Sequence, residues 1–228
     1  MLMNSLSMDK EQARFNMIQQ QIRPAEVLDQ RVLDTIARMP REDFVPEAYR
    51  ELAFSDTNIP LGAYANKGQV MMKPIMEARI LQALDIQPED KILEIGTGSG
   101  YFTALLAALA GQVHSVEIDT VLLGQAEAKL AAHNITNVSL HPGDAARGWE
   151  QGNPYDAIAI TGSLPILPEA YKQSLSIGGR LVAIVGSAPV MEAVLITRVA
   201  EDQWASEALF ETDFPPLENA EQPEAFVF

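Results

Sequence analysis

The sequence predicts a three-layer α/β/α sandwich around a mostly parallel sheet, with a helical cap at its N-terminus. Three observations lead to this fold class. Strand and helix patterns alternate with short links from residue 91 to residue 185. The strands are apolar at nearly every position, as strands covered by helices on both faces are. Three closely spaced glycines join the first of these strands to the helix that follows it.

The expected cap and an active-site lid loop occupy residues 1–75. Apolar residues recur at three- and four-residue spacing between residues 9 and 52, which indicates helices separated by prolines. Residues 56–74 are rich in glycine and proline and are expected to form a loop, of which residues 60–74 would form the lid. A helix over residues 75–84 then leads into the sandwich. The sandwich itself is expected to be one compact unit over residues 76–228.

The remaining elements follow in order. After the alternating region, the helical spacing fades, which favours late antiparallel strands. The last three residues, 226–228, are apolar and would close a sheet edge. The expected strands are 91–95, 113–118, 137–141, 155–161, 180–185, 190–199 and 207–214, and the expected helices between them are 100–110, 120–133 and 167–175.

Composition narrows the function classes. Hydrophobic residues make up 47% and charged residues 21% of the 228 residues, as in ordinary globular proteins. The net charge of −15 disfavours nucleic-acid and membrane partners. No apolar stretch has the ~20 residues of a membrane span. The sequence contains no cysteine, so disulfides and thiolate metal sites are excluded, and no metal is expected. A cytoplasmic location is favoured, because a chain without cysteine fits a reducing compartment. The sequence leaves the oligomeric state open.

The sharpest motif runs from Lys91 to Gly100, where a buried strand meets glycines at positions 96, 98 and 100. Glycines permit a tight turn and a close approach of a ligand to the backbone, and the helix N-terminus offers free N–H groups. The dinucleotide fingerprint requires glycine where Tyr101 stands, and the Glu94 carboxylate would repel a pyrophosphate. That carboxylate suits a ligand with a cationic amine and a sulfonium.

This motif resembles the first motif of the Rossmann-like S-adenosylmethionine-dependent methyltransferases. Glu117, at the tip of the second strand, would accept hydrogen bonds from both ribose hydroxyls. Asp144 would accept from the adenine amine, and Thr161 would lie near the reactive end. The cofactor would be S-adenosyl-L-methionine and the product S-adenosyl-L-homocysteine. The cofactor-binding residues that the resemblance implies are Met71, Met72, Glu94, Gly96, Thr97, Gly98, Ser99, Gly100, Tyr101, Glu117, Ile118, Gly143, Asp144, Ala145 and Thr161.

A narrower resemblance covers roughly residues 10–217. The segment Pro-Arg-Glu-Asp-Phe-Val-Pro at 40–46, with Ile-Pro-Leu-Gly at 59–62 and Gly-Gly-Arg-Leu-Val at 178–182, is similar to the protein-L-isoaspartate (D-aspartate) O-methyltransferases. Pro215-Pro216-Leu217 is similar to a C-terminal segment of that family. The resemblance implies a repair enzyme that methylates the free α-carboxylate of L-isoaspartyl residues, so its partners would be damaged proteins and peptides.

The sequence departs from that family in the lid loop. The family reads Gly-Gln-Thr-Ile-Ser where this chain has Gly-Gln-Val-Met-Met at 68–72, so Met72 stands at the place of the serine and Gln69 is kept. Five residues, 63–67, replace one, and Lys67 or Lys73 could supply a cation to the acceptor. Two alternatives therefore stay open: a methyltransferase of this fold acting on another carboxylate or a small molecule, and a protein that binds the cofactor without catalysis.

Overall fold

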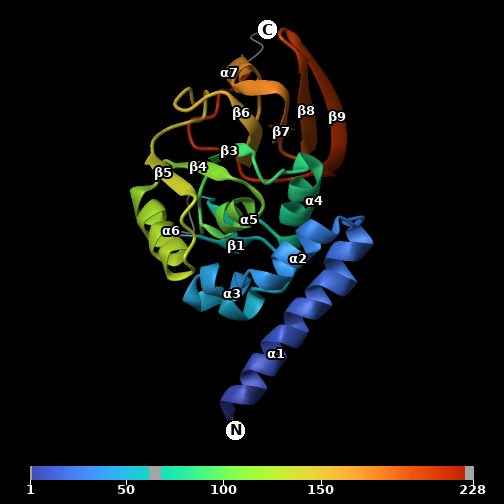
Figure 1. The fold of residues 1–228 in the computed structure, drawn as a ribbon, viewed down its shortest axis with the longest axis vertical. Coiled ribbons are helices and arrows are strands. Elements are labelled where there is room, and N and C mark those ends of the chain that lie inside the picture. The colour runs from blue at the N-terminus through green and yellow to red at the C-terminus, as the bar shows by residue number, and fades with distance from the viewer. Residues whose placement is uncertain (1, 62–67, 224–228) are drawn as a thin grey trace.

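The computed structural model describes residues 2–61 and 68–223, with side chains from residue 9 onward. A seven-stranded sheet forms the centre, in the order β5-β4-β3-β6-β7-β8-β9 (Figure 1). The predicted α/β fold is confirmed. The strands are β3 (Lys91–Ile95), β4 (Gln112–Glu117), β5 (Val138–Pro142), β6 (Tyr155–Leu164), β7 (Leu175–Ser187), β8 (Val190–Ala200) and β9 (Gln203–Thr212).

The strands from β5 to β7 run parallel, and helices α5 (Tyr101–Leu109), α6 (Thr120–Ala132) and α7 (Glu169–Gln173) connect them. The register places Ile95 at the end of β3 opposite Val116 of β4 and opposite Ile160 of β6. Because parallel strands end at the same edge, the glycine loop after β3 lies between the tips of β4 and β6. This edge is where ligands bind in open α/β sheets.

The late strands β8 and β9 are antiparallel, as the sequence predicts, although β9 begins earlier than expected. Two other expectations were wrong in detail. The helix expected over 167–175 is confined to α7, because Leu175 already pairs with Tyr155 in the sheet. The loop expected over 56–74 contains a short antiparallel pair, β1 (Ile59–Pro60) and β2 (Val70–Met71). Residues 226–228, expected to close a sheet edge, lie outside the described residues.

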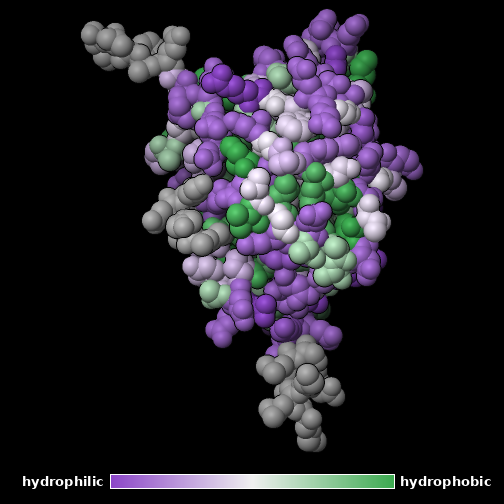
Figure 2. All heavy atoms as spheres, turned by 90° about the vertical axis from the view of Figure 1, so that its left-hand side faces the viewer, coloured by the Kyte–Doolittle hydropathy of each residue, from purple (hydrophilic) through white to green (hydrophobic). Residues whose placement is uncertain are grey.

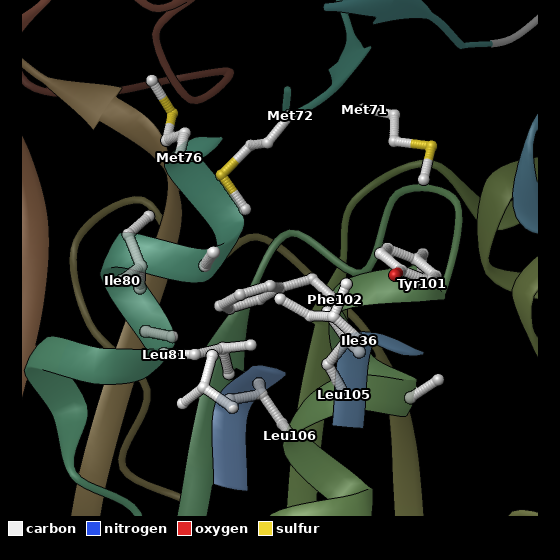
Figure 3. Packing of buried hydrophobic residues seen from close by; sticks show 14 of the residues in the cluster. Ile36, Met71, Met72, Met76, Ile80, Leu81, Tyr101, Phe102, Leu105 and Leu106 are labelled. Carbon is white, nitrogen blue, oxygen red and sulfur yellow. The ribbon is translucent and has the colours of Figure 1, made fainter. Parts of the chain in front are cut away.

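Helices precede the sheet, and the first of them projects away from the body of the molecule (Figure 1). The cap elements pack against α4 and α5, and one hydrophobic cluster extends from Ile36 of the cap through Phe102 and Leu105 of α5 (Figure 3). The division at residue 75 stays a prediction, because this packing crosses it. The elements are α1 (Leu2–Met17), the π-helical turn η1 (Ile18–Ile22), η2 (Arg23–Ala25), α2 (Gln30–Arg38), α3 (Arg41–Phe44), η3 (Glu47–Leu52) and α4 (Pro74–Leu84).

The surface on the side of β5 and α6 is mostly hydrophilic, with an apolar group near its centre (Figure 2). This pattern accords with the net charge of −15. Among the described residues, no helix is both long enough and apolar enough to cross a bilayer.

Candidate functional site

A cavity of about 370 Å³ opens at the carboxyl ends of the central strands. Its volume lies in the range of roughly 300–1,000 Å³ that small-molecule sites occupy. Residues at or just after the ends of β3, β4 and β5 contribute to its walls, together with residues within β6 and residues from the segment around β1 and β2. Of the residues expected from the sequence, those that line it are Gln69, Gly96, Gly98, Glu117, Ile118, Gly143, Asp144, Ala145 and Thr161.

The backbone of the glycine loop has a conformation that residues with a Cβ atom adopt only at an energetic cost. Gly96 and Gly98 have φ angles of +96° and +53°, in the left-handed region. A Cβ atom on Gly98 would lie 3.1 Å from Cδ1 of Leu61, across the cavity wall. The Thr161 hydroxyl lies within hydrogen-bond distance of two carbonyl oxygens, those of Ile95 (2.8 Å) and Gly96 (2.7 Å), and its single proton ties the loop to β6.

Glu117 is the carboxylate at the tip of β4, and its side chain is almost fully buried. Its Oε2 accepts the Gly98 N–H at 2.8 Å, and its Oε1 accepts the Asp119 N–H at 2.9 Å. Burial raises the pKa of this carboxyl. Each carboxylate oxygen can accept more than one hydrogen bond, so Glu117 can fix the glycine loop and still accept from a ligand.

Asp144 follows β5, the edge strand of the sheet, and lines the same cavity. Its Oδ1 accepts the Ala146 N–H at 3.0 Å, and its Oδ2 accepts from Nδ2 of Asn219 at 2.8 Å. Asn219 belongs to the C-terminal segment 214–219, of which residues 214–218 form one wall of the cavity. Ser163 of β6 holds this segment through two backbone hydrogen bonds of 2.9 Å.

Several lining residues were missed by sequence reasoning. The C-terminal wall had one signal, because Pro215-Pro216-Leu217 matches a family segment, but nothing in that segment predicted where it would lie. The rest of the wall has no polar pattern that marks a site. The missed residues of the main cavity are Leu61, Gly68, Val70, Ile95, Val116, Leu122, Ala146, Gly162, Phe214, Pro215, Pro216, Leu217 and Glu218.

A smaller recess of about 30 Å³ lies beyond the glycine loop. It shares Gly96, Gly98 and Thr161 with the main cavity, so the two adjoin. Met71 and Met72 both line it, and their side chains point toward those of Tyr101 and Phe102 on α5 (Figure 3). The expected residues Met71, Met72, Thr97 and Ser99 line this recess, together with the unpredicted Leu61, Val70, Glu77 and Phe102.

Glu94 lines neither cavity in the described part of the chain. Its expected contact with the amine and sulfonium of the ligand therefore stays a prediction. Its side chain is fully buried beneath the loop, where Oε2 accepts from the hydroxyls of Thr103 and Ser115, each at 2.5 Å. Burial raises its pKa to about 8. The alternation of side chains along β3 turns Glu94 away from the cavity that Ile95 lines.

Gly100 and Tyr101 are also absent from the described walls of both cavities. A Cβ atom on Gly100 would lie 3.0 Å from that of Ala126, so this glycine permits close packing of α6. The Tyr101 ring is buried and faces the Arg41 guanidinium, whose Cζ lies 4.8 Å from the ring centroid. Gly100 and Tyr101 therefore contribute to the packing around the loop and not to the described walls of either cavity.

Arg41 is a fully buried cation beside the recess. Its Nη1 donates to Oε2 of Glu77, and its Nη2 donates to the carbonyl oxygen of Met72 at 2.6 Å. Burial raises the pKa of Glu77 to about 8, against the opposing effect of the guanidinium. Of the two lysines considered as cations, Lys67 lies outside the described residues, and Lys73 lines neither cavity.

Comparison with known proteins decides the family. The family model described as protein-L-isoaspartate (D-aspartate) O-methyltransferase matches residues 12–222. The chain belongs to this protein-L-isoaspartate O-methyltransferase family. It is therefore an S-adenosylmethionine-dependent O-methyltransferase by family, and the predicted enzyme class is confirmed.

Relatives of the protein-L-isoaspartate O-methyltransferase family match most of the chain. Protein-L-isoaspartate O-methyltransferase 1 of Rhodopseudomonas palustris (strain HaA2) is 41% identical over 205 residues, which are 90% of this chain and 82% of the relative. The protein of that name from Syntrophus aciditrophicus is 40% identical over 192 residues, which are 84% of this chain and 86% of the relative.

Solved structures share the fold. A protein-L-isoaspartate O-methyltransferase structure superposes with a TM-score of 0.78 at 22% identity, covering 90% of this chain and 66% of that one. A Plasmodium falciparum member of the family, in complex with S-adenosyl-L-homocysteine, superposes with a TM-score of 0.74 at 19% identity, covering 92% and 98%.

Proposed function

We propose that this protein transfers a methyl group from S-adenosyl-L-methionine to the free α-carboxylate of L-isoaspartyl residues in damaged proteins and peptides. One observation carries the proposal. The cavity at the carboxyl ends of the strands combines a left-handed glycine loop, the Glu117 carboxylate bonded to that loop, and Asp144 after the edge strand β5. In a chain of this family, these are the parts of a cofactor site.

The residues present fit the cofactor. Asp144 would accept from the adenine amine, Glu117 would accept from the ribose hydroxyls, and Gly96 and Gly98 would let the ligand approach the backbone. When bound, S-adenosyl-L-methionine supplies an electrophilic methyl group on a sulfonium.

The methyl transfer itself requires few further catalytic groups from the protein. An α-carboxylate has a pKa of about 3.3–3.7, so it is ionised at neutral pH and needs no general base. The protein has mainly to align the acceptor and exclude water. Gln69 lines the main cavity, and Met72 lines the recess, so both would shape the acceptor end. Met72 offers no hydroxyl, and a lost hydrogen bond to a charged oxygen costs about 1.5–3 kcal/mol.

The proposal is tested by transfer of labelled methyl from S-adenosyl-L-methionine to an isoaspartyl peptide, with the matching aspartyl peptide as control. Transfer to the isoaspartyl peptide alone is expected. No transfer, from protein that binds S-adenosyl-L-homocysteine, would contradict the proposed acceptor.

A second candidate function is methylation of a different carboxylate or of a small molecule. The absence of hydroxyls at Val70 and Met72 favours it. Methyl incorporation from a cell extract, without incorporation into the isoaspartyl peptide, would support this candidate. If neither the cell extract nor the isoaspartyl peptide is methylated, the protein binds the cofactor without catalysing transfer.

Glu117→Ala is expected to weaken the binding of S-adenosyl-L-homocysteine by about 1–3 kcal/mol, which is roughly 5- to 150-fold. The variant loses the acceptors for the ribose and also releases the Gly98 N–H that Glu117 now holds. Isothermal titration calorimetry measures the change. Glu127→Ala, at an exposed position on α6, is the matched control and should bind as the wild type does. An affinity of Glu117→Ala within twofold of the wild type would remove Glu117 from the site.

We further propose the cytoplasm as the site of action. The cysteine-free composition fits a reducing compartment. Fractionation of cells that express the tagged chain would test this, and recovery outside the cytoplasmic fraction would contradict it.

A further inference from the structure

The order of the groups along the cavity indicates what the recess would hold. Asp144 marks the expected adenine end, Glu117 the ribose, and the glycine loop comes next. The recess adjoins that loop through Gly96 and Gly98. A ligand with its adenosine at Asp144 and Glu117 would therefore extend its remaining part past the loop toward the recess.

The recess contains a carboxylate that sequence reasoning did not identify. Glu77, in the first turn of α4, lines the recess and is only 2% exposed. Its Oε2 accepts from Arg41, and Oε1 carries no hydrogen bond from any residue in the described ranges. Arg41 also donates to the Met72 carbonyl oxygen, which fixes the guanidinium and thereby the carboxylate. Glu77 is thus held in place by Arg41, and no hydrogen bond joins its Oε1 to another residue in the described part of the chain.

The chemistry of the ligand indicates which of its groups suits this carboxylate. The methionyl part of the cofactor carries an α-ammonium and an α-carboxylate. A carboxylate attracts the ammonium, and it repels both the cofactor carboxylate and an acceptor carboxylate. We infer that Glu77 binds the α-ammonium of the cofactor, with Arg41 as its positioning residue. This inference rests on the proposed cofactor site, and it gives Glu77 the part that the sequence pattern suggested for Glu94.

Ligand binding is expected to change the pKa of Glu77. The charged and titratable groups that face Glu77 are Arg41 from α3, Asp56 from the segment before β1, and Tyr101 from α5. Burial raises the pKa of Glu77, and the Arg41 guanidinium opposes that rise. An ammonium nearby favours the charged carboxylate and lowers the pKa further. The carboxylate form, which pairs with Arg41, is therefore the form that would bind the ammonium.

Calorimetry with two ligands tests the inference. S-adenosyl-L-homocysteine carries the amino-acid group, and 5′-methylthioadenosine lacks it. Glu77→Gln should weaken binding of the first by roughly 10- to 100-fold and leave binding of the second within twofold. Glu42→Gln is the control, because Glu42 pairs with Arg14 and lines neither cavity.

Each result has a defined meaning. Equal losses for both ligands, or an unchanged affinity for S-adenosyl-L-homocysteine, would overturn the assignment of Glu77. Wild-type protein that binds neither ligand would overturn the cofactor site itself, and the inference with it. If Glu77→Gln does not fold, the double variant Arg41→Met/Glu77→Met makes the same comparison without leaving an unpaired buried cation.

Discussion

Gly98→Val is expected to abolish the binding of S-adenosyl-L-methionine and S-adenosyl-L-homocysteine. Gly98 has a φ of +53°, and a Cβ there would already lie 3.1 Å from the Leu61 side chain. Both residues line the cavity, so the branched side chain would occupy ligand space. It would also carry the cost of about 1–2 kcal/mol that a left-handed backbone imposes on a residue with a Cβ. Calorimetry should detect no binding.

The matched control for this variant is Gly124→Val on α6. Gly124 is exposed and has no atom within 4 Å of its Cβ position, so the substitution should leave ligand affinity unchanged. Thermal melting would verify that both variants fold. Binding by folded Gly98→Val within twofold of the wild type would refute the placement of the ligand against the glycine loop.

Arg41→Met is expected to lower the free energy of unfolding by about 3–5 kcal/mol, because it leaves the Glu77 carboxyl buried without its partner. The side chains of this pair are 1% and 3% exposed. The Met72 carbonyl oxygen would lose its donor as well. Urea denaturation without ligand measures the loss.

Two further variants separate this effect from a general loss of charge. Lys172→Met breaks the pair with Glu169, whose side chain is 65% exposed, and should cost only about 0–1 kcal/mol. The double variant Arg41→Met/Glu77→Met should recover most of the stability lost in the single variant, because an apolar pair replaces the ionic one. If Arg41→Met costs no more than Lys172→Met, the buried pair does not stabilise the cap.

Much of the fold follows from local pattern. The apolar strands and the glycines at 96, 98 and 100 predict the parallel sheet and its functional edge. The end of the helix expected at 167–175 could not be predicted, because it depends on the pairing of Leu175 with Tyr155. The C-terminal wall depends likewise on contacts between Ser163 and residues about fifty positions later. Such distant partners leave no periodic signal in the sequence.

Two glutamates show why the site could be predicted only in part from sequence motifs. Glu94 stands beside the glycines in the sequence, yet its side chain lies on the other face of β3, bonded to Thr103 and Ser115. Glu77 lies seventeen positions earlier, in a helix whose apolar residues suggested packing alone. Its helical spacing to Ile80 and Leu81 puts it on their buried face, and a carboxylate on such a face is the signal that could have revealed it.

The C-terminal wall has a consequence for the order in which the protein acquires its properties. Segment 214–219 follows every strand of the sheet in the chain, yet it closes the cavity and reaches Asp144 through Asn219. During synthesis on a ribosome, the strands emerge before this segment does. A nascent chain could thus pair its whole sheet while its ligand site is still missing a wall. Cofactor affinity would be among the last properties that the growing polypeptide gains, after its architecture is in place.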